Sequence, residues 1–440
     1  RKNKTMAIKF IKKAVKTPSS DEVETRQRVQ EILQQIEETR EEGIKEISRK
    51  FDNYEGEIIL SQDKIDDVIK SLDQKIKDDV QFSYDRVRKF AEHQLKHFNN
   101  NFEVELSPGL FAGQKLIPIN TVGCYVPGGR NNYIASAIMS VTAAKVAGVD
   151  NIIACSPARA AEGIHPSIIY AAHLAGVDTL LSLGGVQGVA ALAFGLFSGH
   201  SADILVGPGN RYVAEAKRLL YGRVGIDLFA GPTEIAVIAD DSADPEIIAT
   251  DLAGQAEHGP DSPVWLITTS RELAKAVMAK IPVCISRLQE PNRSVAESAW
   301  RDYGEVVLVD SRESAVAQSD YYAPEHLEVH TENLDWWLRN LRNYGSLFLG
   351  EETTVTYGDK ASGPNHILPT KGSARYTGGL SVAKFIKTVT WQRMTREANR
   401  NVGAVSARIS RAEGMEGHAF SGDDRLRKYF PTEQFDLSAD

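Results

Sequence analysis

Short apolar runs alternate with helical segments from residue 121 onward, and this alternation constrains the fold more than any other feature of the chain. The apolar runs occupy residues 121–126, 151–155, 179–183, 203–206, 234–239 and 264–268, with helical stretches at 135–149, 186–197 and 249–257. Strands that alternate with helices form βαβ units around a parallel sheet. The sequence therefore predicts an α/β fold with two Rossmann-like parallel-sheet domains in succession.

The two ends of the chain have a different texture. Apolar residues recur at three- and four-residue steps among charged ones at 21–51 and again at 61–99, which predicts amphipathic helices in the N-terminal region. We expect these helices to pack against the catalytic part or a second subunit. From Lys371 onward strand signals disappear, and the chain reads as polar and helical. Such a tail either embraces a neighbouring subunit or extends into solvent.

Composition narrows the class of partner. The 440 residues carry a net charge of −8, which disfavours a nucleic-acid surface because such a surface needs clustered Lys and Arg. No run of about 18 apolar residues occurs, so no membrane span is expected. The three cysteines are widely spaced in apolar stretches, and residues 1–16 lack the apolar segment of a signal peptide. We therefore expect a cytoplasmic enzyme with reduced thiols and a small-molecule partner.

Glycine and proline gather where the predicted strands end, at 127–129, 184–185, 207–210 and 231–233. Ligands of open α/β sheets bind beyond the carboxyl ends of the strands, where glycines let backbone amides approach phosphates. A dinucleotide is one candidate ligand, and plain strand-to-helix turns are the other interpretation. The G-x-G-x-x-G fingerprint is absent, since Tyr212 stands where its third glycine would be.

A first candidate for chemistry is the segment 255–262, in which Gln255 and His258 lie three residues apart at a helix end and so share a face. A histidine nitrogen and an amide oxygen can both bind a metal. Asp359 and His418, in loop-like contexts, are further candidate ligands. The alternative is a solvent-facing or helix-capping pair.

A second candidate is the adjacent pair Glu325 and His326, which follows Pro324. Histidine can remove a proton from an alcohol near neutral pH, and a neighbouring carboxylate can activate water in a separate step. The alternative interpretation is a helix N-terminus with a glutamate in its first turn.

A third candidate is the small-residue loop 361–366, which ends in His366 and is followed by Lys371 and Arg375. These two cations could hold an anionic substrate group through charge-assisted hydrogen bonds. They could equally be solvated surface charges.

Together these segments resemble the histidinol dehydrogenase family from about Phe51 to His418. The motifs that carry the resemblance are Val122-Gly123-Cys124-Tyr125-Val126-Pro127-Gly128-Gly129, Gly184-Gly185-Val186-Gln187, Gly207-Pro208-Gly209-Asn210, Ala230-Gly231-Pro232-Thr233-Glu234, Gln255-Ala256-Glu257-His258-Gly259-Pro260-Asp261-Ser262, Pro324-Glu325-His326-Leu327 and Ala361-Ser362-Gly363-Pro364-Asn365-His366. The order of these motifs makes the resemblance specific.

The resemblance implies a homodimer that uses zinc and two NAD to oxidise a primary alcohol through an aldehyde to a carboxylic acid. It makes His326 the base for the alcohol and Glu325 the activator of water. The implied zinc ligands are Gln255, His258, Asp359 and, from the partner subunit's tail, His418. The implied NAD contacts are Tyr125, Gln187 and Asn210. The expected substrate contacts are Thr233, Gln255, His258, His326, Asp359, His366, Lys371, Arg375, Glu413 and His418.

The resemblance also implies a division of the chain. Residues 1–125 and 230–375 are expected to form the first α/β domain with the helical N-terminal region. Residues 126–229 are expected to form the second, NAD-binding domain. Residues 376–440 are expected to form a helical dimerisation tail that swaps between subunits.

Departures from the family pattern bear on the substrate. After the Pro-Gly-Gly segment histidinol enzymes commonly read Ser or Thr, Ala and Pro, whereas this chain reads Arg130-Asn131-Asn132-Tyr133. A Ser-rich segment is replaced by Arg375-Tyr376-Thr377-Gly378-Gly379-Leu380, Thr233 replaces a serine, and Pro364 replaces a threonine. The added Arg130, Lys371 and Arg375 suit an anionic group.

The chain is thus more similar to relatives that oxidise sulfopropanediol (2,3-dihydroxypropane-1-sulfonate) to sulfolactate. Retention of Glu413, which in histidinol enzymes helps hold the cationic substrate, favours L-histidinol instead, unless Glu413 orients His418 or a substrate hydroxyl. Another small polyol, and a non-catalytic metal-binding or scaffold protein, are the further alternatives. A scaffold is disfavoured because Glu325, His326 and all four candidate ligands are present together.

Overall fold

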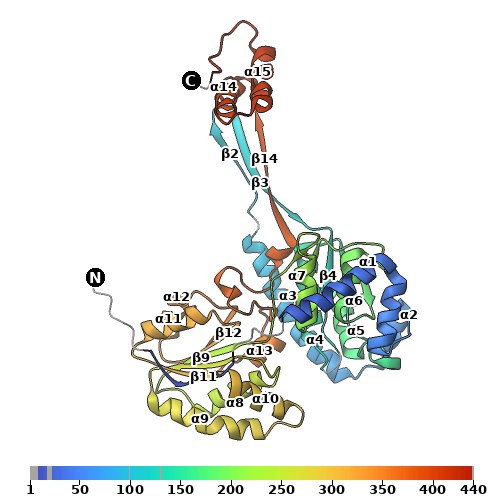
Figure 1. The fold of residues 1–440 in the computed structure, drawn as a ribbon, viewed down its shortest axis with the longest axis vertical. Helices are drawn as coiled ribbons and strands as arrows, with labels where there is room; N and C mark the ends of the chain where they lie inside the picture. Colours follow the sequence, from blue (N-terminus) through green and yellow to red (C-terminus); the bar gives the residue numbers. More distant parts are fainter. Residues whose placement is uncertain (1–7, 17–21, 99, 129–130, 439–440) are drawn as a thin grey trace. The chain divides into compact units, whose positions relative to one another are not determined.

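The computed structural model describes residues 8–16, 22–98, 100–128 and 131–438 (Figure 1). The chain forms two compact units. The first comprises the residues up to Leu95 together with Ile119–Phe385, and the second comprises Lys96–Pro118 and Ile386–Asp440. Among the described residues, no helix combines the length and the apolar character that crossing a membrane requires.

A six-stranded sheet in the first unit has the strand order β1-β11-β10-β9-β12-β13. Its strands are β1 (Ile8–Lys12), β9 (Ile235–Ala239), β10 (Val264–Thr268), β11 (Gly304–Val309), β12 (His326–His330) and β13 (Ser346–Leu349). All neighbours are parallel except β1, which is antiparallel to β11. The central strand β9 is buried along its whole length, as expected when helices cover both faces of a sheet.

Helices cover both faces of this sheet. Ile235, Val237 and Ala239 of β9 pack in one core cluster with α8, α9 and α10, whereas Ala236 and Ile238 pack in another with α11 and α12 (Figure 1). The helices are α8 (Pro245–Ala256), α9 (Arg271–Ser286), α10 (Asn292–Tyr303), α11 (Arg312–Tyr322) and α12 (Leu334–Asn340), and a short α13 (Val355–Lys360) follows β13. Residues 326, 328 and 330 of β12 are in register with 235, 237 and 239, and so face α8.

A second sheet in the first unit is fully parallel and has the strand order β6-β5-β4-β7-β8. Its strands are β4 (Thr121–Tyr125), β5 (Asn151–Cys155), β6 (Thr179–Leu181), β7 (Ile204–Val206) and β8 (Gly225–Ile226). Its helices are α4 (Ile134–Ala147), α5 (Pro166–Ala175), α6 (Gly185–Phe194) and α7 (Arg211–Leu220). The N-terminal helices are α1 (Glu22–Asp52), α2 (Gln62–Ser71) and α3 (Gln74–Phe98).

The structure differs from the predicted division of the chain before residue 126. Helix α1 packs on α6 and α7, and α2 packs on α5, so both belong with the five-stranded sheet rather than with the first α/β domain. Strand β4 also lies in that sheet, and the boundary after Tyr125 was therefore placed too late. The predicted texture of this region as helical is confirmed for α1 to α3, although β1 precedes them as an unexpected strand.

The second unit contains a three-stranded antiparallel sheet, β14-β3-β2, and two helices that pack together. Its elements are β2 (Phe102–Ser107), β3 (Leu110–Pro118), β14 (Ile386–Met394), α14 (Arg396–Ala412) and α15 (Glu416–Tyr429). The tail is helical as predicted from residue 396, but β14 contradicts the expectation that no strand follows Lys371. The missing signal is physical: β14 pairs with β3, about 270 residues earlier, and carries charged and exposed residues.

A buried ion pair holds the turn after β7. Lys217 of α7 and Asp227 are 4% and 0% exposed, and they form a direct salt bridge. The Lys217 ammonium also donates to the carbonyl of Gly207 at 2.9 Å, and the other Asp227 oxygen accepts from the Gly207 amide at 2.8 Å. The pair therefore fixes both backbone groups of the glycine that ends β7.

Replacing Lys217 should leave Asp227 buried without a counter-charge. We expect Lys217→Met to lower the free energy of unfolding by about 3 kcal/mol or more, measured as an earlier transition in urea. Lys70→Met is the control, because Lys70 is exposed and lies 3.8 Å from an equally exposed Asp67. A control shift as large as that of Lys217→Met would contradict the role of the buried pair.

Candidate active site

The Glu325 and His326 pair lies where a strand begins, not where a helix begins. Helix α11 ends at Tyr322 and is followed by Ala323, which adopts a left-handed conformation with φ of 50°, and β12 starts at His326. The helix-terminus interpretation of this segment is therefore wrong. The amide of His326 donates to the carbonyl of Glu234 at 3.3 Å, so the pair is held against the residue that precedes β9. Both side chains are buried, with 7% and 2% of the residue exposed.

A chain of hydrogen bonds links α8, the start of β9 and the start of β12. The Gln255 amide nitrogen donates to the Thr233 hydroxyl at 2.7 Å, and that hydroxyl donates to Glu325 Oε2 at 2.6 Å. Glu325 Oε2 also accepts from the amide of Glu234 at 2.9 Å. Three predicted site residues from different segments are thus brought into contact.

His326 is oriented from both sides of its ring. Its Nδ1 lies 3.0 Å from the carbonyl of Glu234, while Nε2 lies 3.6 Å from Asp359 Oδ1. Within the described part of the chain, the buried Nε2 has no hydrogen-bond partner. Burial lowers the pKa of His326, but Glu325 and Asp359 outweigh this effect and raise it well above its ordinary value. Nε2 is thus a buried ring nitrogen that faces the Asp359 carboxylate.

Asp359 and His366 belong to α13 and the loop that follows it. The His366 Nδ1 lies 3.0 Å from the Asp359 carbonyl, and its Nε2 lies 2.8 Å from the Ser136 hydroxyl of α4. Burial raises the pKa of Asp359, yet the contact with His326 and the nearby His366 and Lys360 lower it below its usual range. Asp359 is therefore an anion. His366, whose pKa burial lowers, joins this site to the five-stranded domain.

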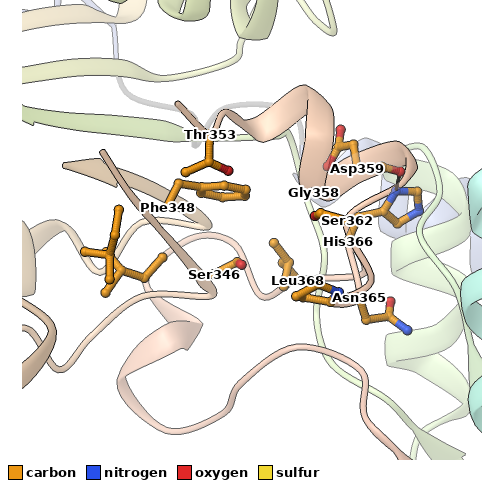
Figure 2. A pocket seen from close by; sticks show the side chains of 12 residues that line it. Ser346, Phe348, Thr353, Gly358, Asp359, Ser362, Asn365, His366 and Leu368 are labelled. Carbon is orange, nitrogen blue, oxygen red and sulfur yellow. Dashed lines mark hydrogen bonds between the residues drawn. The ribbon is translucent and has the colours of Figure 1, made fainter. Parts of the chain in front are cut away.

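A cavity of about 280 Å³ borders these residues. Figure 2 shows Asp359, Ser362 and His366 grouped together, with Ser346 and Phe348 of β13 also lining the space. Because Ser346 is the register partner of His326, the cavity lies next to the start of β12. It is large enough for a small polar molecule.

The predicted metal ligands divide between the two units. In the first unit, Gln255 contacts His326 with 3.3 Å between Nε2 and Nδ1, and Asp359 contacts His326 on its other nitrogen. His258 follows α8 and is exposed. The surrounding protein lowers the pKa of His258 by more than the nearby Asp359 raises it. His418 lies in α15 of the second unit, and Glu413 ends α14 there, both exposed. The first unit thus supplies three of the four predicted ligands.

Glu234 is a site residue that the sequence did not single out. It is 4% exposed, its Oε1 accepts from the amide of Lys371 at 2.8 Å, and its backbone binds both Glu325 and His326. Burial raises the pKa of its carboxyl to about 8. The signal was available in principle, because Glu234 immediately follows Thr233 in the Gly-Pro-Thr-Glu segment.

The three basic candidates have different surroundings. Lys371 is exposed, and its side chain lies against Gly231, where an added Cβ atom would be 3.1 Å from the lysine Cε. The Arg375 guanidinium donates to the backbone carbonyls of Tyr321 and Gly372. Arg130 lies outside the described residues. Of the described pair, Lys371 is the cation that contacts the turn leading to Thr233.

The predicted NAD contacts lie together at the carboxyl ends of β4, β6 and β7. The buried Tyr125 hydroxyl accepts from the amide of Gly185 at 3.1 Å, and the buried Gln187 donates to Asp52, the last residue of α1, at 2.8 Å. The Asn210 side chain caps α7 by accepting from two backbone amides. Each of these side chains has a structural role, and together they outline the edge where ligands of parallel sheets bind.

Gly207 is required at this edge. Its φ is +114°, and a Cβ atom would lie 2.0 Å from the carbonyl oxygen of Tyr125. Neither the backbone conformation nor the space admits a side chain.

We expect Gly207→Ala to lower the free energy of unfolding by about 3 kcal/mol or more, because steric overlap adds to backbone strain. The matched control is Gly199→Ala, whose φ of +75° is also positive but whose Cβ would meet nothing within 4 Å. That control should lose only about 1 kcal/mol. Equal losses in urea unfolding would show that the close approach to Tyr125 contributes nothing.

Comparison with known proteins decides the family. The histidinol dehydrogenase family model matches residues 15–426. The chain belongs to the histidinol dehydrogenase family. Members of this family are NAD-dependent oxidoreductases that act on CH–OH donors. The crystal structure of histidinol dehydrogenase from Elizabethkingia anophelis matches with a TM-score of 0.86 and 32% identity, covering 95% of this chain and 94% of that one. The predicted α/β fold is confirmed by this match.

Two relatives match over nearly their whole length. A histidinol dehydrogenase homolog from Pelagibacter ubique is 63% identical over 424 residues, which cover 96% of this chain and 99% of the relative. A sulfopropanediol 3-dehydrogenase from Ruegeria pomeroyi is 56% identical over 434 residues, which cover 99% of this chain and 100% of the relative. A histidinol dehydrogenase from Methanothermobacter thermautotrophicus is 38% identical over 400 residues, which cover 91% of this chain and 93% of the relative.

Proposed function

We propose that this family member is a zinc- and NAD-dependent dehydrogenase that oxidises (R)-2,3-dihydroxypropane-1-sulfonate through an aldehyde to sulfolactate. The observation that carries the proposal is the pairing of a carboxylate, Glu325, with an imidazole, His326, at 3.4 Å in one buried site. The name of the Ruegeria pomeroyi relative supports the substrate. A single site that holds both groups suits a four-electron oxidation in two stages.

His326 acts in the first stage. Its Nδ1 contacts the Glu234 carbonyl, which favours the tautomer that donates there and leaves Nε2 as the base. Nε2 removes the hydroxyl proton as hydride leaves the alcohol carbon, so the alcohol becomes an aldehyde. General-base assistance of this kind contributes about 100-fold or more.

Glu325 acts in the second stage. Its Oε2 is held by the Thr233 hydroxyl and the Glu234 amide, so Oε1 is the atom that can take a proton from water. The activated water attacks the aldehyde, and loss of a second hydride from the hydrate leaves the carboxylate. The fixed carboxylate orientation reduces the entropy cost of this step.

For zinc we propose Gln255, His258 and Asp359 together with His418 of the partner subunit. Imidazole and oxygen donors suit this ion. The Gln255 amide nitrogen donates to Thr233, so its amide oxygen remains for a metal. Asp359 is anionic and lies beside His326 Nε2, which has no hydrogen-bond partner among the described residues. A zinc ion would anchor the substrate hydroxyl and stabilise the charge left on its oxygen. Because the family resemblance assigns this position to the tail of the partner subunit, we propose a homodimer whose sites are shared.

For NAD we propose the edge outlined by Tyr125, Gln187 and Asn210. Glycine-lined turns at the carboxyl ends of parallel strands are suited to a dinucleotide. NAD supplies the hydride acceptor in both stages. The contact between His366 and Ser136 joins α4 of this domain to α13, so the two domains can present cofactor and substrate to one another.

For the sulfonate we propose Lys371. It lies against Gly231, close in the chain to Thr233, and its backbone is tied to Glu234. The Arg375 guanidinium instead lies at the backbone carbonyls of Gly372 and Tyr321. L-Histidinol is the alternative substrate, favoured by Glu413 and by relatives with that activity in their name.

The substrate is tested with purified protein, zinc and NAD, offered L-histidinol and 2,3-dihydroxypropane-1-sulfonate in parallel. We expect turnover of the sulfonate with two NADH formed for each molecule consumed. Lys371→Met should raise KM for the sulfonate far more than Arg375→Met does. Turnover of L-histidinol alone would contradict the sulfonate, and one NADH with accumulated aldehyde would contradict the second stage.

The division of labour predicts a split between two variants. His326→Ala should slow the first oxidation by about 100-fold or more, measured as single-turnover NADH formation from the alcohol. Glu325→Gln should retain the first oxidation better than the second, because its amide cannot accept the proton of water.

The control is the aldehyde offered directly to both variants. His326→Ala should oxidise the aldehyde faster, relative to wild type, than it oxidises the alcohol. Alcohol oxidation by His326→Ala at nearly the wild-type rate would remove His326 from the mechanism.

A further inference from the structure

A second group of metal-ligating side chains lies under α8, apart from the residues assigned above. Asp251 of α8 and Glu328 and His330 of β12 bring one ligand atom each within 4.8 Å of one another. Glu328 is 0% and His330 is 2% exposed. Asp251 precedes Gln255 by one helical turn, and Glu328 follows His326 by two strand residues. This group therefore lies roughly 6 Å back along α8 and roughly 7 Å onward along β12.

The atoms that face one another in this group lack partners. Across the described ranges, no hydrogen bond is formed by Asp251 Oδ2, Glu328 Oε2 or either ring nitrogen of His330. His330 Nε2 does approach Glu328 Oε2 to 3.4 Å. Buried polar atoms are nearly always satisfied, and a set of convergent exceptions points to a missing ion or water.

The other oxygen of each carboxylate is already occupied. Asp251 Oδ1 accepts from the Thr354 hydroxyl at 3.0 Å, and Glu328 Oε1 accepts from the amide of Val355 at 2.9 Å. The start of α13 thereby turns Oδ2 and Oε2 towards His330. The carboxylates are held by the fold with one free oxygen each, as ligands of a metal are.

The charges require compensation. Two carboxylates in a buried position repel each other, and a single imidazole neutralises at most one of them. Burial raises the pKa of Asp251 to about 7, and the neighbouring Glu328 contributes to this rise. Either a proton or a cation must therefore complete the group.

We propose that Asp251, Glu328 and His330 form a second metal site that takes a divalent transition-metal ion of the zinc class. One imidazole and two carboxylates are a donor set that zinc accepts. With bonds of about 2.0–2.2 Å in tetrahedral geometry, two ligands of one ion lie about 3.3–3.6 Å apart. Side-chain movements of about 1 Å bring the three atoms, which lie within 4.8 Å of one another, into this range, and water supplies any remaining position.

The metal would stabilise the packing of the elements that carry the active-site residues. It would join α8, which carries Gln255, to β12, which begins with His326, through the residues that contact the start of α13, which carries Asp359. Its role is structural, because Glu328 and His330 are buried and lie beyond His326 along β12 rather than at the start of the strand.

The test measures zinc by mass spectrometry after loading with Zn²⁺ and exhaustive dialysis of the full chain. Wild type should retain two zinc per chain, and Glu328→Gln, which keeps an oxygen for Val355, should retain one. Gln255→Ala should also retain one, and the double variant none. Because the two single variants lose different ions, failure of this site and failure of the proposed catalytic zinc are distinguishable.

Glu305→Gln is the matched control. Glu305 is a buried carboxylate of β11, in the same sheet but separated from β12 by β10 and β9, and its oxygens accept from Tyr322 and Ala14. Its loss should leave two zinc in place. His330→Gln guards against a folding defect peculiar to Glu328→Gln, and circular dichroism checks both.

Anomalous diffraction at the zinc edge should show a peak among Asp251, Glu328 and His330. Unchanged zinc content in Glu328→Gln, or no anomalous peak at this position, would overturn the proposal in favour of a shared proton. One zinc per chain that Gln255→Ala removes and Glu328→Gln leaves would overturn it as well. One zinc that only Glu328→Gln removes would support it while refuting Gln255 as a ligand.

Discussion

The site depends on one hydrogen bond, from the Thr233 hydroxyl to Glu325. Thr233 also accepts from Gln255, so this hydroxyl joins a helix, the approach to β9 and the start of β12 in one buried contact. Glu234 reinforces the junction through its backbone and places His326 beside Glu325. The groups meet at the amino ends of two parallel strands, where the backbone amides that precede each strand are not committed to the sheet. The protein uses the amide of Glu234 to orient the Glu325 carboxylate.

Much of the fold follows from the sequence because periodicity is a local property. The strands at 151–155 and 264–268 were predicted at their observed bounds, since each is a short apolar run between helical stretches. Strand β12 was missed because Pro324 and Glu325 precede its first residue, His326, and this segment is equally typical of a helix start. The β3–β14 pairing was missed because it joins distant, partly exposed segments that no local pattern relates.

The residues of the candidate site, too, could be predicted only where the local sequence carries the signal. Residues in motifs, such as Gln255 and His326, were found from sequence because their chemistry is concentrated in a few positions. Glu234 was missed because its contacts with Glu325 and His326 are made by its backbone, and a backbone contact leaves no signal in the residue type. The Asp251, Glu328 and His330 group escaped because it requires a helix face to be laid over alternate positions of a strand 77 residues later. Only the packing of α8 on β12 relates them.

Strand β1 has a consequence for solubility. It lies antiparallel to β11 and completes one margin of a sheet whose other strands are parallel. Its exposed Lys9 and Phe10 lie between half-buried residues, and Lys12 extends to the carbonyl of Gly304. An uncovered margin would offer a row of free amides and carbonyls to another chain. The first strand therefore acts as a cover against edge-to-edge aggregation, and a shortened chain that lacks it would retain the catalytic groups but expose β11 to self-association.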